Sequence, residues 1–286
     1  MKRIVDELSL PLVTVIVAVY NGVQTLQQCL DSVLQQTYQQ IELIVIDGGS
    51  TDGTIDLLLK NSQQIRYWIS EPDRGIYHAW NKALAQATGD WICFLGADDF
   101  LWNEQVLSRV VVQLAQVPEA INVVYSQTSL LGADGGVLYS IGEPWPQVKD
   151  RFKQLMCIPH PSVLHRSRLF KNSGGFDESF QIAGDYELLL RELKDKDAFF
   201  MPSIIFSAMR QGGISSALGN TSSALREVRA AQRKNGLQWP GWVWLLALAR
   251  AYMRALSWFV LGERRTRVVL DCGRRLRGLP RHWTKT

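Results

Sequence analysis

The sequence predicts an α/β fold, an open and mostly parallel β-sheet with helices on both faces. Two observations predict it. Continuous apolar, β-branched runs, typical of strands buried on both faces, alternate along residues 13–95 with segments whose apolar residues recur at helical spacing. The connections between these segments are short, which favours parallel neighbouring strands joined by crossover helices.

The expected elements follow in chain order. The first apolar run is Val13–Val19, and the apolar positions of residues 23–36 predict a helix after it. The next three expected strands lie at residues 41–46, 66–70 and 91–95, with helices between them at residues 54–60 and 75–87. Beyond these we expect a helix at 103–116, short strands at 123–125 and around 132–136, a helix at 185–194 and strands at 198–201 and 204–208.

The C-terminal region differs in composition. From residue 226 onward the chain carries 14 Lys and Arg against three Asp and Glu, so the remainder is acidic overall. Residues 241–262 are almost wholly apolar, with Arg250 and Arg254 as their only charges. We predict a catalytic domain at 1–218 and a helical, basic, membrane-associating region with amphipathic helices at 219–286.

Three arrangements are open for residues 241–262. The segment reaches the ~20 residues that span a bilayer, but each central arginine would add roughly 2.5–3.5 kcal/mol to insertion. An amphipathic helix in the membrane plane, with Arg250 and Arg254 toward the headgroups, avoids that cost. The third arrangement is a helix packed on the protein itself or on a second subunit.

The basic tail predicts an anionic partner, either a lipid surface or nucleic acid, unless it is only a solvated helix face. Five of the ten tryptophans lie from residue 239 onward, which favours lipid over nucleic acid. Residues 1–11 lack the apolar stretch of a signal peptide, and the four cysteines form no C-x-x-C motif. We therefore expect reduced thiols and a location on the cytoplasmic face of the inner membrane.

Acidic residues follow three of the expected strands. Asp47 follows the second strand, Asp73 the third, and Asp98 and Asp99 the fourth. Ligands of open parallel sheets bind at the carboxyl ends of the strands, so these side chains should share one edge. Each of them alone could be a turn or helix-capping residue. Together they predict a ligand site that includes a cation.

The chain lacks both common glycine-rich phosphate-binding motifs, G-x-G-x-x-G and G-x-x-x-x-G-K-[ST]. A phosphate ligand would need another source of positive charge. Mn²⁺ or Mg²⁺ held by carboxylates is the natural candidate, because hard cations prefer oxygen ligands and bridge to phosphate oxygens. Arg74 and Lys82 would assist.

Six motifs in one order resemble those of the family 2 glycosyltransferases, which have a GT-A fold. The motifs are Val13–Asn21, Asp47–Gly53, Glu71–Tyr77, Asn81–Lys82, Gly89–Asp90 and Gly96–Asp99. Their order and spacing match over about residues 11–215. The resemblance is nearest to bacterial enzymes that build exopolysaccharide, capsule or O-antigen units.

The resemblance implies a nucleotide-sugar site. Asp47 would accept a hydrogen bond from the base, with uracil expected, and Asp98 would ligate the metal on the diphosphate. Asp99 would hold the donor or support Asp98. The further residues that the resemblance places around the donor are Ala18, Tyr20, Asn21, Ser50, Asp73, Arg74 and Lys82. The family's D-x-D motif begins with Asp, whereas this chain has Gly96, so one carboxylate contact is missing.

The resemblance also implies a catalytic base. Asp185 matches the family's base, an Asp that opens a helix after a Gly-Phe-Asp segment, although Gly184 replaces the Glu of many relatives. Its alternative role is to cap that helix. His160 would face the acceptor side or be structural. Residues 211–215 resemble a loop that closes near the donor, or form only a glycine-rich turn.

The expected function is inverting, metal-dependent transfer of a hexosyl group from a nucleotide-sugar to a saccharide or lipid-linked saccharide. Three alternatives remain open. A non-catalytic scaffold is suggested by Gly96 and Gly184, and a nucleic-acid-binding protein by the basic tail. A nucleotidyltransferase would also place carboxylates and a metal at a sheet edge, but the sequence has no Gly/Lys-rich loop after the first expected strand.

Overall fold

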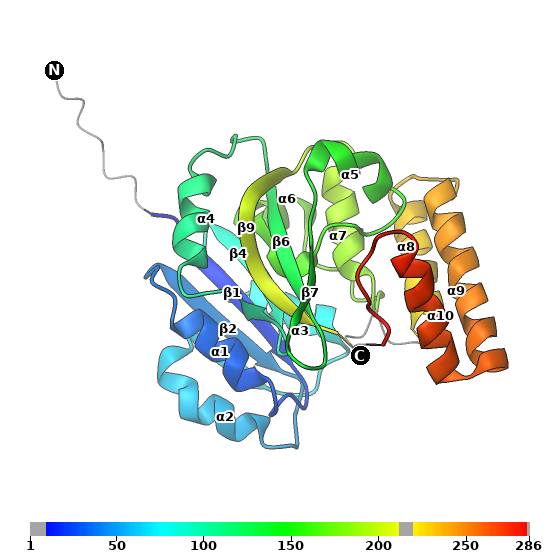
Figure 1. The fold of residues 1–286 in the computed structure, drawn as a ribbon. Coiled ribbons are helices and arrows are strands. Elements are labelled where there is room, and N and C mark those ends of the chain that lie inside the picture. Colours follow the sequence, from blue (N-terminus) through cyan, green and yellow to red (C-terminus); the bar gives the residue numbers. More distant parts are fainter. Residues whose placement is uncertain (1–9, 212–219, 285–286) are drawn as a thin grey trace.

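A computed structural model describes residues 10–211 and 220–284 and confirms the α/β fold (Figure 1). Its strands are β1 (Val13–Val19), β2 (Ile41–Asp47), β3 (Tyr67–Ser70), β4 (Trp91–Gly96), β5 (Phe100–Leu101), β6 (Val123–Leu131), β7 (Val137–Ile141), β8 (Val163–Arg166) and β9 (Phe199–Arg210). In this part of the chain they form one sheet, ordered β3-β2-β1-β4-β8-β6-β9-β5, with β7 paired to β6. Strands β1 to β4 run parallel to one another.

The helices are α1 (Leu26–Leu34), α2 (Thr54–Asn61), α3 (Ile76–Leu84), α4 (Val106–Leu114), α5 (Trp145–Phe152), α6 (Ser167–Ser173), α7 (Gly184–Leu193), α8 (Thr221–Lys234), α9 (Trp242–Leu261) and α10 (Glu263–Arg275). Two hydrophobic cores lie on opposite faces of the sheet. On β1, Val15 and Val17 face the core formed with α1, α2 and α4. Ile16 and Ala18 face the core formed with α3, α5 and α7. The alternation of side chains along a strand produces this division.

The strand register aligns the ends that were expected to carry the site. Val19 of β1 pairs with Asp47 of β2, and Asp47 pairs with Ser70 of β3. On the other side of β1, Ala18 pairs with Gly96 of β4. The loops that follow these four strands therefore leave the sheet from one edge, as the sequence predicted.

The second half of the chain differs from the prediction. Helices α5 and α6 and strand β8 were not expected, and β9 is one strand of 12 residues where two short strands were predicted. Proline usually interrupts a strand, because it cannot donate to a ladder. Strand β9 instead passes through Pro202 and Ser203 by an irregularity, with Ser203 at φ 62° and shifts in the register with β6.

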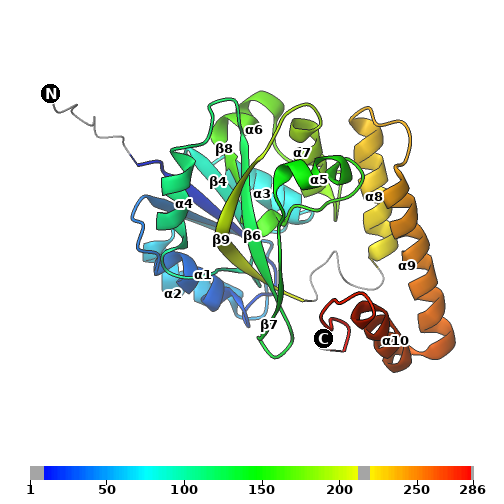
Figure 2. The same cartoon turned by 45° about the horizontal axis from the view of Figure 1, so that its top comes forward.

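The C-terminal helices α8, α9 and α10 stand beside the sheet and its covering helices (Figure 2). Helix α8 packs on α7, and α9 packs on α8, where the Trp244 ring N–H donates to the Leu225 carbonyl at 2.9 Å. The chain end returns to the sheet, because the ring nitrogen Nδ1 of His282 lies 3.2 Å from the Tyr139 hydroxyl of β7.

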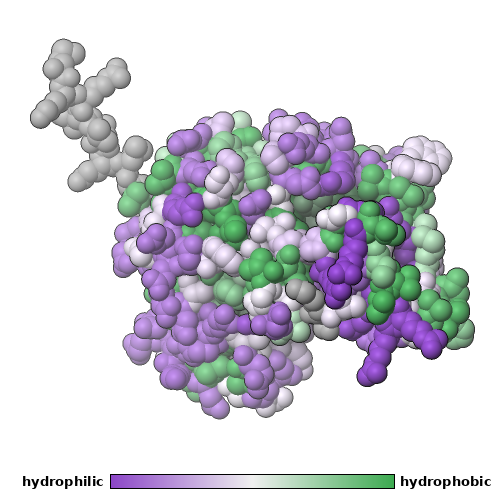
Figure 3. All heavy atoms as spheres, in the orientation of Figure 1, coloured by the Kyte–Doolittle hydropathy of each residue, from purple (hydrophilic) through white to green (hydrophobic). Residues whose placement is uncertain are grey.

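Helix α9 exposes its apolar face. By length and composition it is a helix that could cross a membrane, and little of it is buried in the protein. Its exposed face is formed by Trp242, Leu245, Ala249, Tyr252, Met253, Leu256, Phe259 and Val260. Figure 3 shows hydrophobic residues at the edge of the molecule where α9 lies, beside the hydrophilic residues of α10.

Arg254 packs against the protein, as in the third of the arrangements expected for residues 241–262. Its guanidinium donates to the Thr221 hydroxyl at 2.6 Å and lies 5.0 Å from the centre of the Trp283 ring. It therefore contacts α8 and the chain end and is turned away from the exposed face of α9. Arg250 is exposed at the margin of that face. The face itself is uncharged because both arginines lie to its side.

Candidate active site

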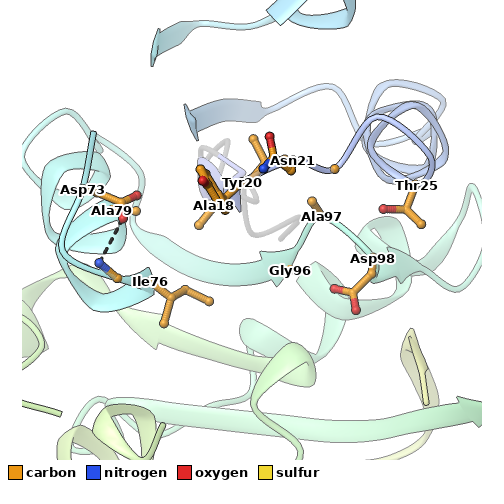
Figure 4. A pocket seen from close by; sticks show the side chains of 13 residues that line it. Ala18, Tyr20, Asn21, Thr25, Asp73, Ile76, Ala79, Gly96, Ala97 and Asp98 are labelled. Carbon is orange, nitrogen blue, oxygen red and sulfur yellow. Dashed lines mark hydrogen bonds between the residues drawn. The ribbon is translucent and has the colours of Figure 1, made fainter. Parts of the chain in front are cut away.

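An open pocket of about 460 Å³ lies at the carboxyl ends of β1 and β4 (Figure 4). This volume falls within the usual range for small-molecule sites. Its lining residues come from the ends of β1 and β4 and from the segments that lead into α1 and α3: Ala18, Val19, Tyr20, Asn21, Gly22, Thr25, Asp73, Gly75, Ile76, Ala79, Gly96, Ala97 and Asp98.

The residues of the predicted donor site that line this pocket are Ala18, Tyr20, Asn21, Asp73 and Asp98. Figure 4 shows Ala18 and Tyr20 between Asp73 on one side and Asp98 on the other. The Tyr20 side chain is 68% exposed although it is large and aromatic. An exposed aromatic ring in a pocket suits stacking against a flat ligand group such as a nucleobase.

Asp47 is buried, and its carboxylate already receives hydrogen bonds from the protein. The Gly49 and Ser50 amides donate to it at 3.1 and 2.9 Å, and the Ser70 hydroxyl at 2.6 Å. The Ser50 hydroxyl donates to its second oxygen. Asp47 thus organises the loop after β2, and its expected contact with a base stays a prediction.

Ser50 and Asn21 extend this network to the pocket. The Asn21 amide donates to the Ser50 hydroxyl at 2.7 Å, and the Thr51 amide donates to the Asn21 side-chain oxygen at 2.9 Å. Asn21 has φ 50°, a left-handed conformation that asparagine tolerates better than most residues. The loops after β1 and β2 are thus fixed together, and Asn21 is the member of this network that reaches the pocket.

Asp73 approaches the backbone of the β2 loop closely. A Cβ atom added at Gly48 would lie 2.7 Å from Asp73 Oδ2, so glycine leaves room for this carboxylate. The Gly75 amide donates to Asp73 Oδ1 at 2.9 Å, which fixes the turn before α3. Gly48 of the Asp47–Gly53 motif therefore has a steric role.

Arg74 and Lys82 lie outside the pocket lining. Arg74 pairs with Glu178, and Lys82 pairs with Glu71 at 2.9 Å. The structure thus places both predicted phosphate-assisting cations against carboxylates of neighbouring loops. Their expected role toward phosphate would require these ion pairs to open.

Asp98 occupies the space above Gly96. A Cβ atom at position 96 would lie 2.7 Å from Asp98 Oδ1 and 3.3 Å from Asp99 Oδ2. A side chain at position 96 would therefore displace the Asp98 carboxylate from its present place. The Asp98 carboxylate can thus take its present position because residue 96 is a glycine and not the first Asp of the D-x-D motif.

Asp99 is buried behind Asp98. Burial raises the pKa of Asp99 well above its usual value, and the neighbouring Asp98 carboxylate raises it further. Arg210, at the end of β9, acts on this pKa in the opposite direction. A bound cation would balance the negative charge of these two adjacent carboxylates.

The donor set of this site fits a hard divalent cation that shares its ligands with a phosphate. Among residues 10–211 and 220–284, no group of three or more His, Cys, Asp and Glu is arranged to hold a metal ion. Mg²⁺ commonly needs only one or two carboxylates when phosphate oxygens complete its shell. Asp98, with its carboxylate in the pocket beside Asp99, matches that requirement.

Asp185 lies in the first turn of helix α7, as predicted, and is half-buried. Its surroundings raise the pKa of Asp185 to about 6, mainly because of burial. The Tyr186 amide donates to Asp185 Oδ1 at 2.8 Å, and the Tyr77 hydroxyl donates to the same oxygen at 3.3 Å. A carboxylate with a pKa near this value is suited to accept a proton near neutral pH.

Gly184 accommodates Tyr77. A Cβ atom at position 184 would lie 2.7, 2.8 and 2.9 Å from three carbon atoms of the Tyr77 ring. The ring rests against this glycine, and its hydroxyl reaches Asp185. Tyr77 follows Ile76 of the pocket lining, so the start of α7 lies beside the α3 wall of the pocket.

His160 lies in the core. Its ring is surrounded by Trp80, Phe94 and Phe176, and its Nε2 atom has no hydrogen-bond partner in the described structure. Burial lowers the pKa of His160 to about 3, so the ring is neutral. These surroundings are typical of a structural histidine, and the expected role on the acceptor side stays a prediction.

Sequence reasoning missed several residues of the site. Some line the pocket only because the sheet register and the helix starts bring them there: Thr25, Ile76, Ala79 and Ala97. Tyr77 lies inside a recognised motif, yet its contact with Asp185 spans 108 positions and no local pattern signals it. The expected loop at 211–215 lies outside the described residues except for its first member.

Comparison with known proteins decides the family. The model of the family described as Glycosyl transferase family 2 matches residues 14–157, half of the chain. This chain belongs to glycosyl transferase family 2. The matched segment carries Ala18, Asp47, Asp73 and Asp98 of the predicted site, whereas Asp185 lies beyond it.

Curated relatives of this family 2 glycosyltransferase are also named glycosyltransferases. A PGL/p-HBAD biosynthesis glycosyltransferase of Mycobacterium bovis is 28% identical over 213 residues, which cover 73% of this chain and 80% of that protein. An uncharacterized glycosyltransferase of Mycobacterium tuberculosis is 35% identical over 188 residues, which cover 64% of this chain and 69% of that protein.

Solved structures share the fold. The S. aureus protein TarS, residues 1–349 in complex with UDP-GlcNAc, aligns with a TM-score of 0.60 and 18% identity, covering 77% of this chain and 66% of that one. The chain spans only 39% of a longer TarS structure. The mannosyltransferase PcManGT of Pyrobaculum calidifontis, in complex with GDP-Man and Mn²⁺, also has a TM-score of 0.60 and 18% identity, covering 93% of this chain and 80% of that one.

Proposed function

We propose that this family 2 glycosyltransferase is inverting and metal-dependent, and that its nucleotide-sugar donor is a UDP-sugar. The observation that carries the proposal is the presence of two carboxylate sites. Asp98 lies in the pocket at the strand ends, and Asp185, with its raised pKa, lies beside the α3 wall of the same pocket. The first suits a diphosphate-bound cation, and the second suits proton removal.

The donor would occupy the pocket between Tyr20 and Asp98. The Tyr20 ring would stack on the base, and Asp98, supported by Asp99, would hold Mn²⁺ or Mg²⁺ on the diphosphate. When bound, the metal would neutralise the charge that develops on the leaving diphosphate. The complexes of TarS with UDP-GlcNAc and of PcManGT with GDP-Man and Mn²⁺ support a donor of this class.

Asp185 would act as the base. An acceptor hydroxyl oxygen forms a bond to C1 of the donor sugar while the bond from C1 to the phosphate oxygen breaks, and its electron pair leaves with the nucleoside diphosphate. The hydroxyl proton passes to the Asp185 carboxylate. Attack from the face opposite the leaving group inverts the configuration at C1. The Tyr77 hydroxyl would hold the carboxylate in place for this transfer.

The direct test is release of nucleoside diphosphate from a panel of UDP-sugars, with Mn²⁺ and a bacterial lipid extract as the acceptor source. We expect Asp185→Asn to lower kcat by about 100-fold or more, because general base catalysis is lost. Asp195→Asn, at an exposed aspartate beyond the end of α7, is the matched control. Full activity of the Asp185→Asn variant would remove Asp185 from this role.

For the acceptor, we propose a saccharide on a polyprenyl lipid, used in bacterial exopolysaccharide, capsule or O-antigen synthesis at the cytoplasmic face of the inner membrane. The resemblance of the motifs to enzymes of these pathways supports it. The exposed apolar face of α9 supports it independently, since Phe259 is 91% and Leu256 63% exposed to solvent. A contiguous exposed apolar face of this kind marks an interaction surface.

The occupant that we propose for this face is an anionic lipid surface. Helix α10, next to it, exposes arginines together with apolar side chains: Arg264, Arg265, Val268, Val269 and Arg275. Apolar side chains flanked by arginines are typical of helices that lie in the membrane plane. Each basic residue near an anionic leaflet contributes about 1 kcal/mol.

Co-sedimentation with vesicles of phosphatidylglycerol and phosphatidylcholine tests this surface. We expect the wild-type protein to sediment with anionic vesicles, less so at high salt, and the double variant Leu256→Ser, Phe259→Ser to remain in solution. Leu59→Ser removes an exposed leucine of α2 and should leave binding unchanged. Equal binding by the double variant and the wild-type protein would exclude α9 as the membrane surface.

A further inference from the structure

We propose that Glu227, on the C-terminal helix α8, is a positioning residue for Asp185. The inference rests on the proposed function, in which Asp185 is the base. The connection between the two residues runs through the turn that leads into α7. Ala183, the last residue of that turn, lies 44 positions before Glu227, so no local sequence pattern signals their contact.

The Glu227 carboxylate receives three consecutive backbone amides. The Gln181 amide donates at 3.1 Å to each oxygen, and the Ile182 and Ala183 amides each donate at 2.8 Å to Oε2. Ala183 directly precedes α7, and no side-chain cap hydrogen bond is made at this position. A carboxylate from another helix therefore occupies the anion-binding turn at the start of α7.

These contacts fix the backbone that carries Asp185. Hydrogen bonds from amides to a carboxylate are stronger than neutral ones, and a negative charge at a helix N-terminus is favourable. Glu227 is the only acidic residue in Thr221–Lys234, a segment that also holds four basic residues. Glu227 is therefore the only carboxylate that α8 can offer to these amides.

The same turn borders the donor pocket. A Cβ atom at Gly75, which lines the pocket, would lie 3.0 Å from the Gln181 side-chain oxygen. Loosening the turn would therefore disturb both Asp185 and the rim of the pocket. A displacement of about 1 Å in a reacting group can lower a rate by ~100-fold.

Glu227 also acts on the site electrostatically. Its negative charge raises the pKa of both Asp185 and Tyr77. The titratable side chains with the largest effects on the pKa of Asp185 are Tyr77 from α3, which donates a hydrogen bond to it, and Glu227 from α8. Removing the charge at position 227 should lower the pKa of Asp185 and move the acidic limb of activity to lower pH.

The experiment compares Glu227→Gln and Glu227→Ala with Lys234→Met in the full-length protein, measuring kcat and KM for the nucleotide-sugar across pH. Lys234→Met is the matched control, because Lys234 joins α8 to α7 and to the segment before it through ion pairs with Glu187 at 3.4 Å and Asp177 at 2.6 Å, but makes none of the amide contacts. Hydrogen exchange of the amides at 181–183 measures how well Glu227 protects this turn, and it needs no knowledge of the substrates.

We expect Glu227→Ala to lower kcat by about 10- to 100-fold with little change in KM, and to speed exchange of the three amides. Glu227→Gln, which keeps one acceptor oxygen, should retain more activity, and in both variants the acidic limb should move to lower pH. Lys234→Met should change none of these.

Two results would overturn the proposal. If the Glu227 variants only lose thermal stability, as Lys234→Met does, and keep the wild-type acidic limb, Glu227 is structural. If Glu227→Ala is poorly folded, the acidic limb of the nearly isosteric Glu227→Gln decides the question. Activity in an Asp185→Asn variant measured in parallel would instead show that the base assignment, and this inference with it, is wrong.

Discussion

At the scale of single residues, Asp185 lies among groups that act on its pKa in opposite directions. Burial raises the pKa, whereas the hydrogen bonds from the Tyr186 amide and the Tyr77 hydroxyl lower it. The resulting value of about 6 lies above the ordinary value for aspartate. Because a base must be ionised to accept a proton, the rate should follow this balance.

We expect kcat to decrease as the pH falls through about 6, the pKa of Asp185. Tyr77→Phe removes a hydrogen bond that favours the ionised carboxylate, so the pKa should rise and the acidic limb should move to higher pH. The measurement is kcat against pH for the wild-type protein and this variant, with Tyr252→Phe on the exposed face of α9 as control. A limb that stays in place or moves to lower pH would contradict the role of Tyr77.

Residues at strand ends could be predicted from the sequence, but their contacts could not. The positions of Asp73 and Asp98 follow from the parallel register, which brings successive strand ends to one edge. The saturation of Asp47 by neighbouring donors and the contact of Tyr77 with Gly184 depend on loop conformation and on tertiary packing. Neither the hydrogen bonds to Asp47 nor the contact of Tyr77 with Gly184 produces a periodic pattern in the sequence.

At the scale of elements, strands buried on both faces were predictable and the later elements were not. Strand β1 is apolar along its length because two cores cover it. Strand β8 has only four residues and ends in His165 and Arg166, so its alternation is too short to identify. Helix α5 buries Trp145, Val148 and Phe152 at helical spacing, a signal that was present in the sequence and was overlooked.

Trp244 is the residue through which α9 docks on α8. It is buried, it belongs to the core on the α3 and α7 side, and its ring N–H donates to the Leu225 carbonyl. We expect Trp244→Ala to lower the free energy of unfolding by roughly 3 kcal/mol, since it removes a buried aromatic ring and leaves a cavity. Chemical denaturation measures this change.

Trp242→Ala is the control for Trp244→Ala. Trp242 lies on the same helix but is 70% exposed, so its loss should change the free energy of unfolding by less than about 0.5 kcal/mol. If the two substitutions destabilise the protein equally, α9 is not held to the rest of the protein by Trp244.

At the scale of the whole molecule, an acidic body that carries the site joins a basic set of helices. The boundary expected between residues 218 and 219 stays a prediction, because residues 212–219 lie outside the described structure. Two contacts argue that the parts act as one unit. Glu227 of α8 holds the turn before Asp185, and Trp244 of α9 holds α8. The membrane surface that we propose on α9 would therefore be mechanically linked to the catalytic turn.

The most direct measurement is the thermal stability of the protein with a panel of nucleotide-sugars, in the presence and absence of Mn²⁺. A ligand at about 100 times its Kd adds about 2.7 kcal/mol of stability. We predict that a UDP-sugar raises the melting temperature only with Mn²⁺, and that Asp98→Ala abolishes the increase while Asp134→Ala, in the exposed turn between β6 and β7, retains it. Stabilisation without Mn²⁺, or an undiminished increase in the Asp98→Ala variant, would contradict a metal-held donor at Asp98.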